Sequence, residues 1–312
     1  MQQDSEQIRV AISTSSFGEL DDSPLNLLES AGIQVTPNPF GRRLTEPEII
    51  THLNGIHGLL AGLEPLTRNV LESVPTLRAI ARVGIGITNV DIEAAQDLDI
   101  RVSNTPEGPT TAVAEMTVAA LLTLSRNILA ANSALHAGQW QKSIGTGLRG
   151  IKVLFIGFGR IGQRTYEYLA PFGIQAMVYD PFIEQPLSDK GITFVSLEEG
   201  LAQADAITLH AAGDVPILGP DEFRMMRDGV ILLNSARGKL VDEDALASAL
   251  ESGKVRSAWF DAFWEEPYRG KLIGFDQVLL TPHISTYTKQ CRLSMEMAAV
   301  RNILQDLEIE TD

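Results

Sequence analysis

The sequence predicts an α/β protein built from two doubly wound parallel sheets, and three observations support this fold class. Short apolar segments alternate with amphipathic ones along most of the chain, a pattern typical of parallel strands with helices on both faces of the sheet. A chain of 312 residues is too long for one ordinary core and suits two domains. A proline- and glycine-rich turn at residues 105–109 separates two blocks of this alternation.

Composition limits the classes of protein that remain. No apolar run reaches the ~18 residues of a membrane span, and the polar, acidic residues 1–7 lack the features of a signal peptide. A single cysteine, Cys291, cannot form an internal disulfide and suits a reducing compartment, so we expect a cytoplasmic protein without a membrane partner. The net charge of −15, from 40 acids and 25 bases, argues against nucleic acid as a partner.

The first block contains apolar segments that we interpret as strands at residues 8–12, 58–61, 79–83 and 100–104, with a helix at 24–31. A long helix is predicted at about residues 110–129, as a connection between the domains. One of its faces carries Val113, Met116, Thr117, Ala120, Leu121 and Leu124. The last helix, at residues 287–307, follows the second block and is expected to fold back on the first.

The second block opens with a glycine pattern in a specific context. A strand at residues 153–156 leads into a G-x-G-x-x-G loop, a helix follows at 163–172, and a second strand at 175–179 ends at Asp180. This order predicts a dinucleotide site whose pyrophosphate lies on the N–H groups of the helix start. The loop residues concerned are Gly157, Gly159, Arg160, Ile161 and Gly162. A carboxylate at Asp180 suits the two ribose hydroxyls of NAD and repels the 2′-phosphate of NADP, and residues 181–184 contain no cation.

Polar and small residues follow each apolar strand of the second block. The predicted strand ends are Gly157, Asp180, His210, residues 235–237, residues 261–263 and residues 281–283. Because open parallel sheets bind ligands at the carboxyl ends of their strands, Asp180, Arg237, Asp261 and His283 are expected to meet in one crevice.

A hydride-transferring cofactor needs a protein group that handles the accompanying proton. Two of the five histidines, His210 and His283, stand at predicted strand ends, and we interpret His210 as a wall of the cofactor site. From the residues alone, His283 is either a catalytic acid–base group or a structural histidine. In the same way, Arg237 is a carboxylate ligand or an exposed turn residue, and Glu266 is a partner of His283 or a loop acid.

Three motifs together resemble the signatures of one enzyme family. They are Asn-Ser-Ala-Arg-Gly around Arg237, Asp-Ala-Phe-Trp-Glu-Glu-Pro around Glu266, and Leu-Thr-Pro-His ending at His283. With the segments at residues 82–91, 104–106 and 114–115, they resemble the D-isomer-specific 2-hydroxyacid dehydrogenases, in particular the phosphoglycerate dehydrogenase-like branch. The resemblance extends from about residue 58 to residue 288.

The resemblance implies an NAD-dependent oxidoreductase that interconverts a small D-2-hydroxy acid, with 3-phosphoglycerate among the candidates, and its 2-oxo acid. Arg237 would hold the substrate carboxylate, and His283, kept protonated by Glu266, would exchange the proton. The turn of Gly84 and Ile85 would offer N–H groups to the carboxylate. Asp261 would anchor the nicotinamide amide, and the cofactor would be lined by His210, Ala211, Ser235 and Ala236.

The family architecture further implies a Rossmann NAD domain at residues 104–283, inserted in a flavodoxin-like substrate domain formed by residues 1–103 and 284–312. It also implies a homodimer formed around the helix at residues 110–129. No metal ligand is expected.

The sequence departs from the family pattern at three places. Residues 211–213 lack a proline after His210, residues 284–286 lack a glycine pair after His283, and residues 60–64 lack the arginine and serine of phosphoglycerate-specific members. An alternative function is an NAD-sensing binding protein with the same fold. A formate dehydrogenase-like function is less favoured, because that branch lacks a carboxylate equivalent to Glu266.

Overall fold

The computed structural model describes residues 7–183 and 191–309, which form two compact units. Unit 1 comprises Met1–Pro109 and Tyr287–Asp312, and unit 2 comprises Thr110–Thr286. The divisions fall a few residues after the predicted ones, because the first residues of the connecting helix, from Glu107 to Pro109, belong to unit 1 and the turn after His283 stays with unit 2. Residues 1–6 lie outside the described residues, and so does Glu184. The prediction about a signal peptide rests partly on the first of these, and the prediction about cations after Asp180 partly on the second.

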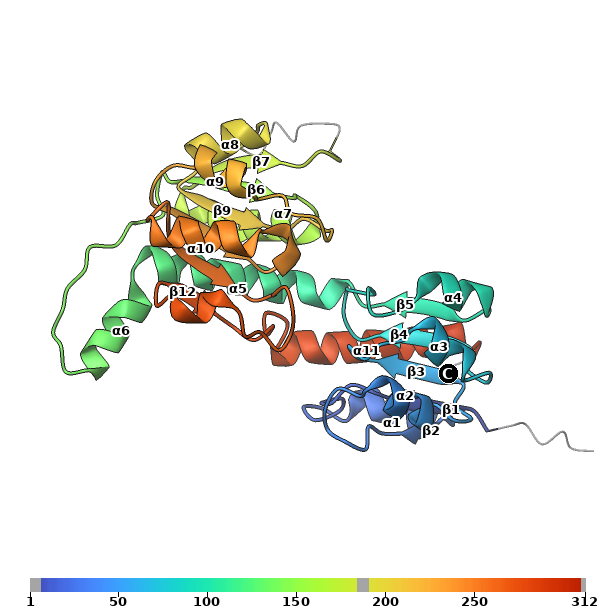
Figure 1. Cartoon of the computed structure of the whole chain (residues 1–312). Coiled ribbons are helices and arrows are strands. Elements are labelled where there is room, and N and C mark those ends of the chain that lie inside the picture. Colours follow the sequence, from blue (N-terminus) through green and yellow to red (C-terminus); the bar gives the residue numbers. More distant parts are fainter. Residues whose placement is uncertain (1–6, 184–190, 310–312) are drawn as a thin grey trace, which may run out of the picture. The chain divides into compact units, whose positions relative to one another are not determined.

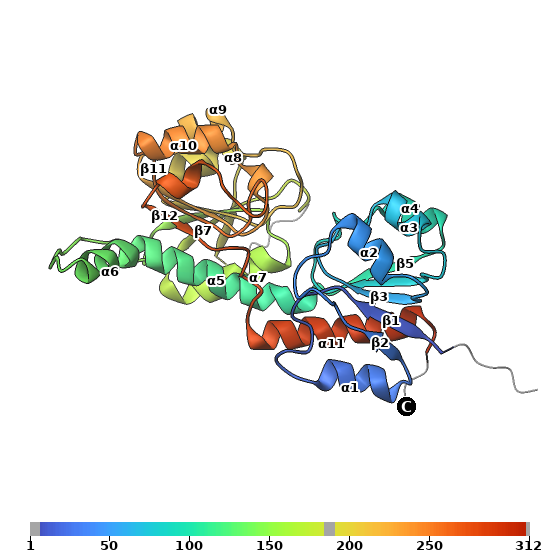
Figure 2. The same cartoon turned by 60° about the horizontal axis from the view of Figure 1, so that its bottom comes forward.

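Unit 1 is a five-stranded parallel sheet in the order β2-β1-β3-β4-β5. Helices α1 and α11 cover one face, and α2, α3 and α4 cover the other (Figure 2). The strands are β1 (Arg9–Ile12), β2 (Gln34–Thr36), β3 (Gly58–Ala61), β4 (Ala79–Arg82) and β5 (Arg101–Asn104). The helices are α1 (Ser23–Ser30), α2 (Glu46–His52), α3 (Arg68–Glu72), α4 (Ile92–Asp97) and α11 (Lys289–Asp306). All four residues of β3 and of β4 are buried, as expected of strands covered on both faces.

The last helix, α11, packs on this sheet as predicted. A side chain at Gly58, the first residue of β3, would meet Leu307 and Ile303 at 2.9 and 3.0 Å, so the C-terminal end of α11 lies at the amino end of β3. The N-terminal end of α11 therefore lies toward the carboxyl ends of the strands.

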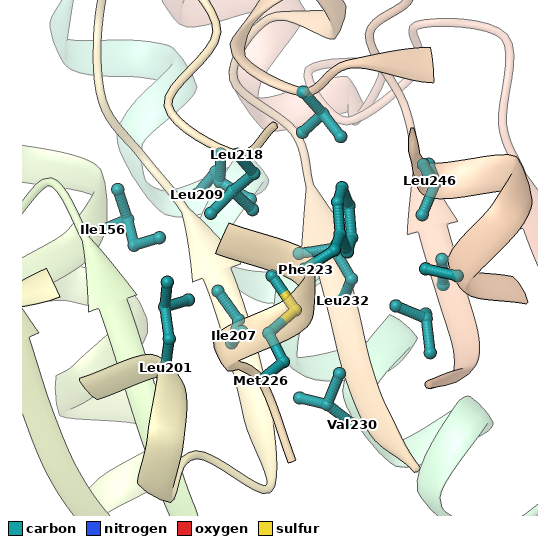
Figure 3. Packing of buried hydrophobic residues seen from close by; sticks show 14 of the residues in the cluster. Ile156, Leu201, Ile207, Leu209, Leu218, Phe223, Met226, Val230, Leu232 and Leu246 are labelled. Carbon is teal, nitrogen blue, oxygen red and sulfur yellow. The ribbon is translucent and has the colours of Figure 1, made fainter. Parts of the chain in front are cut away.

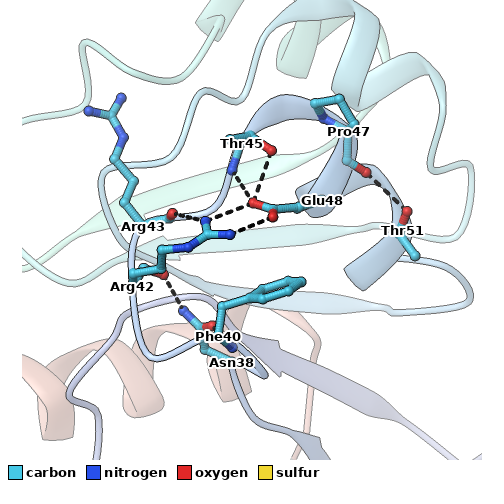
Figure 4. Close-up of polar contacts among 8 residues, drawn as sticks. All are labelled: Asn38, Phe40, Arg42, Arg43, Thr45, Pro47, Glu48 and Thr51. Carbon is cyan, nitrogen blue, oxygen red and sulfur yellow. Dashed lines mark hydrogen bonds and ion pairs between the residues drawn. The ribbon is translucent and has the colours of Figure 1, made fainter.

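The segment before α2 is held by a compact polar network (Figure 4). Arg42 donates to both oxygens of Glu48, at 2.9 and 2.7 Å, and Glu48 also accepts from the N–H and the hydroxyl of Thr45, at 2.9 Å each. The hydrogen bond from Arg42, followed by that from the Thr45 N–H, lowers the pKa of Glu48 to about 2. Asn38 donates to the carbonyl of Ser13, so the segment is tied to the end of β1.

Unit 2 is a seven-stranded parallel sheet in the order β12-β11-β10-β9-β6-β7-β8 (Figure 1). The strands are β6 (Lys152–Ile156), β7 (Gln175–Tyr179), β8 (Ile192–Phe194), β9 (Ala206–Leu209), β10 (Val230–Asn234), β11 (Val255–Phe260) and β12 (Val278–Leu280). The helices are α5 (Glu107–Ser125, which begins in unit 1), α6 (Ile128–His136), α7 (Arg160–Leu169), α8 (Leu197–Gln203), α9 (Pro220–Met225) and α10 (Glu243–Glu251). If the strands are renumbered along the chain with β6 as strand 1, the first six lie in the sheet in the order 3-2-1-4-5-6. This is the strand order of dinucleotide-binding domains.

The core of unit 2 fixes the carboxyl ends of its strands. Figure 3 shows Ile207 and Leu232, on neighbouring strands, packed against Phe223 and Met226. These side chains are buried, and the cluster extends to α8 and α10 through Leu201 and Leu246. A second buried cluster contains the alternate residues of the same strands, so each strand is held from both sides before its polar end begins.

The predicted single helix at residues 110–129 is wrong in its bounds. Helix α5 ends at Ser125, and Asn127 adopts a left-handed backbone with φ of 54°, from which α6 begins in a new direction. No single described helix is long and apolar enough to cross a membrane; α5 and α6 would meet that test only as a pair bent by 63°.

Candidate active site

The glycine loop after β6 has the close approaches that a dinucleotide site needs. Gly157 has φ of +86°, and a Cβ there would lie 2.5 Å from the N atom of Ala211, so only glycine fits between the ends of β6 and β9. A Cβ at Gly162 would lie 2.6 Å from the carbonyl oxygen of Gly157, which keeps α7 against the loop. The space around Gly159 is open within 4 Å, and Arg160 and Ile161 form the first turn of α7, where N–H groups can bind a pyrophosphate.

Asp180, directly after β7, is hydrogen-bonded to the loop. Its Oδ2 accepts the N–H of Phe158 at 2.7 Å, and its Oδ1 accepts the N–H of Phe182 at 2.9 Å. Since each carboxylate oxygen has a second lone pair, Asp180 retains the capacity to accept ribose hydroxyls. The glycine loop and Asp180 therefore fit a nicotinamide dinucleotide.

His210, at the end of β9, is unsuited to acid–base chemistry. Its Nε2 is 2.9 Å from the Thr208 hydroxyl, its ring stacks on Phe155, and its Nδ1 is buried with no hydrogen-bond partner among the described residues. Burial lowers the pKa of His210 to about 3, so this imidazole is neutral at physiological pH. A neutral ring beside Gly157 is consistent with the predicted role as a wall of the cofactor site.

The turn after β10 is shaped by Asn234, a residue to which the sequence analysis gave no role of its own. This fully buried amide donates to the carbonyl of Arg237 at 2.8 Å and accepts the N–H of Ala236 at 3.0 Å, which closes the turn around Ser235. The signal for it was the asparagine itself, since this side chain readily bonds the backbone two residues on.

Gly238 brings this turn against the loop that carries Glu266. A Cβ at Gly238 would collide with the backbone of Phe263, so only glycine permits this approach of the two backbones. Arg237, one residue earlier, is partly buried and donates from Nη1 to the carbonyl of Ala236 at 2.7 Å. Its charge is close enough to lower the pKa of both Glu266 and His283.

His283 and Glu266 form a hydrogen-bonded pair at the end of β12. The imidazole Nδ1 lies 2.9 Å from both oxygens of Glu266, which also accepts the N–H of Phe263 at 3.3 Å. A carboxylate at this position holds a proton on Nδ1, and the hydrogen bonds of the imidazole to the described residues are all made by Nδ1, none by Nε2. The side chain of His283 is 43% exposed, so Nε2 is available to a ligand.

The electrostatics of the pair favour the charged form of the imidazole. The hydrogen bond to Glu266 raises the pKa of His283 against the opposing effect of burial, and the charges of Glu266 and Asp261 add to the increase. Burial alone would raise the pKa of Glu266, but its hydrogen bond and attraction to His283 leave that pKa below the ordinary value. His283 is therefore a histidine suited to donate a proton near neutral pH.

Asp261 has a contact that the sequence did not reveal. This buried carboxylate accepts the Thr281 hydroxyl at 2.6 Å and the N–H groups of Ile284 and Ser285 at 2.9 Å each. It thereby holds the turn in which His283 adopts a positive φ of 53°. The predicted contact of Asp261 with the nicotinamide amide stays a prediction.

In unit 1, the turn after β4 offers two backbone donors. The N–H of Gly84 donates to the Thr105 hydroxyl at 2.8 Å, whereas the N–H groups of Ile85 and Gly86 make no hydrogen bond within the described chain. The donors available to a ligand are therefore those of Ile85 and Gly86, and Gly84, with φ of +141°, shapes the turn.

The structure thus brings together Arg237, Glu266 and His283 in unit 2, and separately joins the glycine loop, Asp180 and the residues after β9. Within the described ranges, no group of three or more His, Cys, Asp or Glu side chains is placed to hold a metal ion. A Rossmann-type sheet with these two clusters defines an oxidoreductase that uses a nicotinamide dinucleotide.

Comparisons with known proteins identify the family. Residues 118–285 match the family model described as D-isomer specific 2-hydroxyacid dehydrogenase, NAD binding domain. A hydroxypyruvate reductase from Thermotoga maritima is 35% identical over 253 residues, which are 78% of this chain and 82% of that protein. Human D-3-phosphoglycerate dehydrogenase is 34% identical over 281 residues, 88% of this chain but 52% of that protein, so the chain spans about half of its length.

Among solved structures, the TT0316 protein from Thermus thermophilus is similar with a TM-score of 0.89 and 31% identity, over 96% of this chain and 97% of that one. The chain belongs to the D-isomer-specific 2-hydroxyacid dehydrogenase family and is an NAD-dependent oxidoreductase. This confirms the resemblance, the fold class and the cofactor inferred from the sequence.

Proposed function

We propose that this chain interconverts a small D-2-hydroxy acid and its 2-oxo acid, with His283 as the proton donor and acceptor. The observation that carries the proposal is the His283–Glu266 pair, with the charge of Arg237 beside it, at the carboxyl edge of the sheet that holds the dinucleotide loop. A charged imidazole, a fixed carboxylate and a guanidinium are the groups that reduction of a 2-oxo acid requires.

In this mechanism, Arg237 binds the substrate carboxylate and polarises the neighbouring carbonyl. In unit 1, the N–H groups of Ile85 and Gly86 are proposed as donors to the acidic end of the substrate, as the family resemblance implies for this turn. His283 gives the proton on Nε2 to the carbonyl oxygen during reduction and takes it back during oxidation, while Glu266 holds the ring and balances its charge. The bound nicotinamide supplies or accepts the hydride.

The proposal is tested by following NADH oxidation with a panel of 2-oxo acids. Hydroxypyruvate and 3-phosphohydroxypyruvate come first, since the relatives include a hydroxypyruvate reductase and D-3-phosphoglycerate dehydrogenases, and pyruvate, 2-oxobutyrate and oxaloacetate complete the panel. We expect turnover with at least one member. Pure protein that binds NADH but reduces none of them would contradict the proposal and favour an NAD-sensing role.

Replacing Glu266 by glutamine is expected to shift the pH dependence of reduction. Glu266 raises the pKa of His283, so in the variant this pKa falls. Reduction needs protonated His283 and declines as the pH rises through its pKa; the decline therefore moves to lower pH in the variant. The measurement is kcat for NADH oxidation from about pH 5 to about pH 10, a range that spans the ordinary histidine pKa, with Glu265→Gln, a neighbouring acid without this contact, as the control. Superimposable profiles of the variant and the wild type would refute the role of Glu266.

We also propose a homodimer formed through α6 and the segment after it. Trp140 and Ile144 are 82% and 99% exposed, and Ile128 and Leu135 on α6 are more than half exposed. Large apolar side chains gathered on one segment are typical of a protein interface. The same segment follows the helix through which the family resemblance implied a dimer.

Light scattering coupled to gel filtration tests the dimer. We expect twice the chain mass for the wild type and a monomer for the double variant Trp140→Ser/Ile144→Ser. Val215→Ser, which removes a similarly exposed apolar side chain from another loop, should leave the dimer intact. A monomeric wild type at micromolar concentration would contradict the proposal.

A further inference from the structure

Arg292, near the start of α11, is a buried arginine that the proposed mechanism does not use. It is 9% exposed, and its Nη2 donates to Glu296 Oε1 at 2.7 Å and to the Ser16 hydroxyl at 3.1 Å. Its guanidinium carbon lies 5.5 Å from the ring centre of Tyr287. Three neighbours therefore fix the orientation of this guanidinium.

The fixed guanidinium still has unused donors. Arginine carries five N–H groups, of which the two contacts at Nη2 account for two. Neither Nε nor Nη1 bonds to the described residues and neither is fully enclosed, so both remain available as donors. Glu296 pairs with Nη2 alone, through Oε1, and its second oxygen accepts the N–H of Gly18 at 3.1 Å. Because these donors are already oriented, a ligand that binds them loses little side-chain entropy of Arg292.

Arg292 lies at the same edge of the unit 1 sheet as the donors of Ile85 and Gly86. Helix α11 runs antiparallel to β3, so its first turns lie at the carboxyl ends of the strands. Ser16, bonded to Arg292, follows the end of β1, and the turn with Ile85 follows the end of β4. Strands β1 and β4 flank β3, which separates them by two strand spacings, or about 10 Å.

The turn between these two positions, after β3, presents no charge of its own. Glu64 is fully buried and accepts the Ser13 hydroxyl at 2.5 Å and the N–H of Gly62 at 3.1 Å, so its carboxylate points inward. The exposed side chain of the turn is Leu63. An anion at Arg292 therefore meets no competing acid from this turn.

We propose that the substrate carries a second acidic group, a carboxylate or a phosphate on its third or fourth carbon, which binds Arg292. The inference rests on the proposed function, because it places the 2-oxo acid end at the turn of Ile85 and Gly86. A chain of three or four carbons with an acid at each end has the length to span the two strand spacings, about 10 Å, when its contacts are included. Arg292 supplies the cation that residues 60–64 lack.

The test compares matched pairs of 2-oxo acids that differ in the distal acid. The pairs are 3-phosphohydroxypyruvate with hydroxypyruvate, and oxaloacetate with 2-oxobutyrate. We expect the wild type to prefer the acidic member of at least one pair in kcat/KM. The pair that shows the preference tells phosphate from carboxylate. In Arg292→Gln the preference falls by about 10- to 100-fold, the loss expected for a hydrogen bond to a charged group.

Three further variants separate recognition from a structural role. Arg292→Lys keeps the charge and should restore part of the preference. Arg292→Gln/Glu296→Gln leaves no unpaired acid and remains informative if the single variant does not fold. Arg68→Gln, a change of the same kind on the surface of α3, should keep the wild-type ratio.

Two results would overturn the inference. One is a wild type that reduces the non-acidic members as well as the acidic ones. The other is a folded Arg292→Gln variant that loses both members of a pair equally. Failure of the proposed function looks different, because then no 2-oxo acid is reduced at all.

Discussion

Replacing His283 by glutamine is expected to lower kcat for 2-oxo acid reduction by about 10²- to 10⁴-fold, the usual contribution of a general acid. Glutamine keeps the polar character of the position but cannot carry the proton. The KM for NADH is expected to change little, because the glycine loop and Asp180 follow β6 and β7, whereas His283 follows β12 at the far edge of the sheet. Steady-state kinetics and NADH fluorescence titration measure the two effects separately.

His136→Gln is the matched control, since it makes the same exchange at an exposed position of α6. It should retain wild-type kcat. A fully active His283→Gln variant would remove His283 from the chemistry. His210 would not be the alternative, because with a pKa of about 3 it is not in the imidazolium form that acts as an acid at neutral pH.

The sequence was most informative where residue identity and backbone position are tightly linked. The predicted strands at residues 58–61 and 175–179 match β3 and β7, and the polar ends of the unit 2 strands lie along one sheet edge. This succeeded because buried parallel strands read as continuous apolar runs, and their ends are marked by small and polar residues. Strand β8 escaped prediction because it has three residues and only one of them is buried.

Other features depend on contacts between distant residues. The break between α5 and α6 falls at Ser125, Arg126 and Asn127, between two apolar stretches, and the left-handed backbone of Asn127 that turns the chain there is seen only in the structure. Asp261 could be placed at a strand end, but its bonds to Thr281, Ile284 and Ser285 form only when β11 and β12 pair. Ser16 and Glu296 are far apart in sequence, and in the structure both accept hydrogen bonds from Nη2 of Arg292. Only this arrangement shows which donors of Arg292 remain unused.

Replacing Arg237 by lysine is expected to lower kcat/KM for the 2-oxo acid by about 10²- to 10³-fold, mainly by raising KM, even though the charge is kept. The loss of two hydrogen bonds to a charged group accounts for an effect of this size. Lysine lacks the planar fork that holds a carboxylate through two parallel hydrogen bonds. Arg224→Lys, an exposed arginine on α9, is the control and should leave kcat/KM unchanged.

Arg237→Gln adds a test through pH. The charge of Arg237 lowers the pKa of His283, so its removal raises that pKa, and the decline in reduction should move to higher pH, opposite to the shift expected for Glu266→Gln. Measuring kcat against pH for the two variants under the same conditions decides the matter. Shifts in the same direction would mean that Arg237 and Glu266 do not act on His283 as two opposed charges, and Arg237 would then be a carboxylate ligand without a part in tuning the acid.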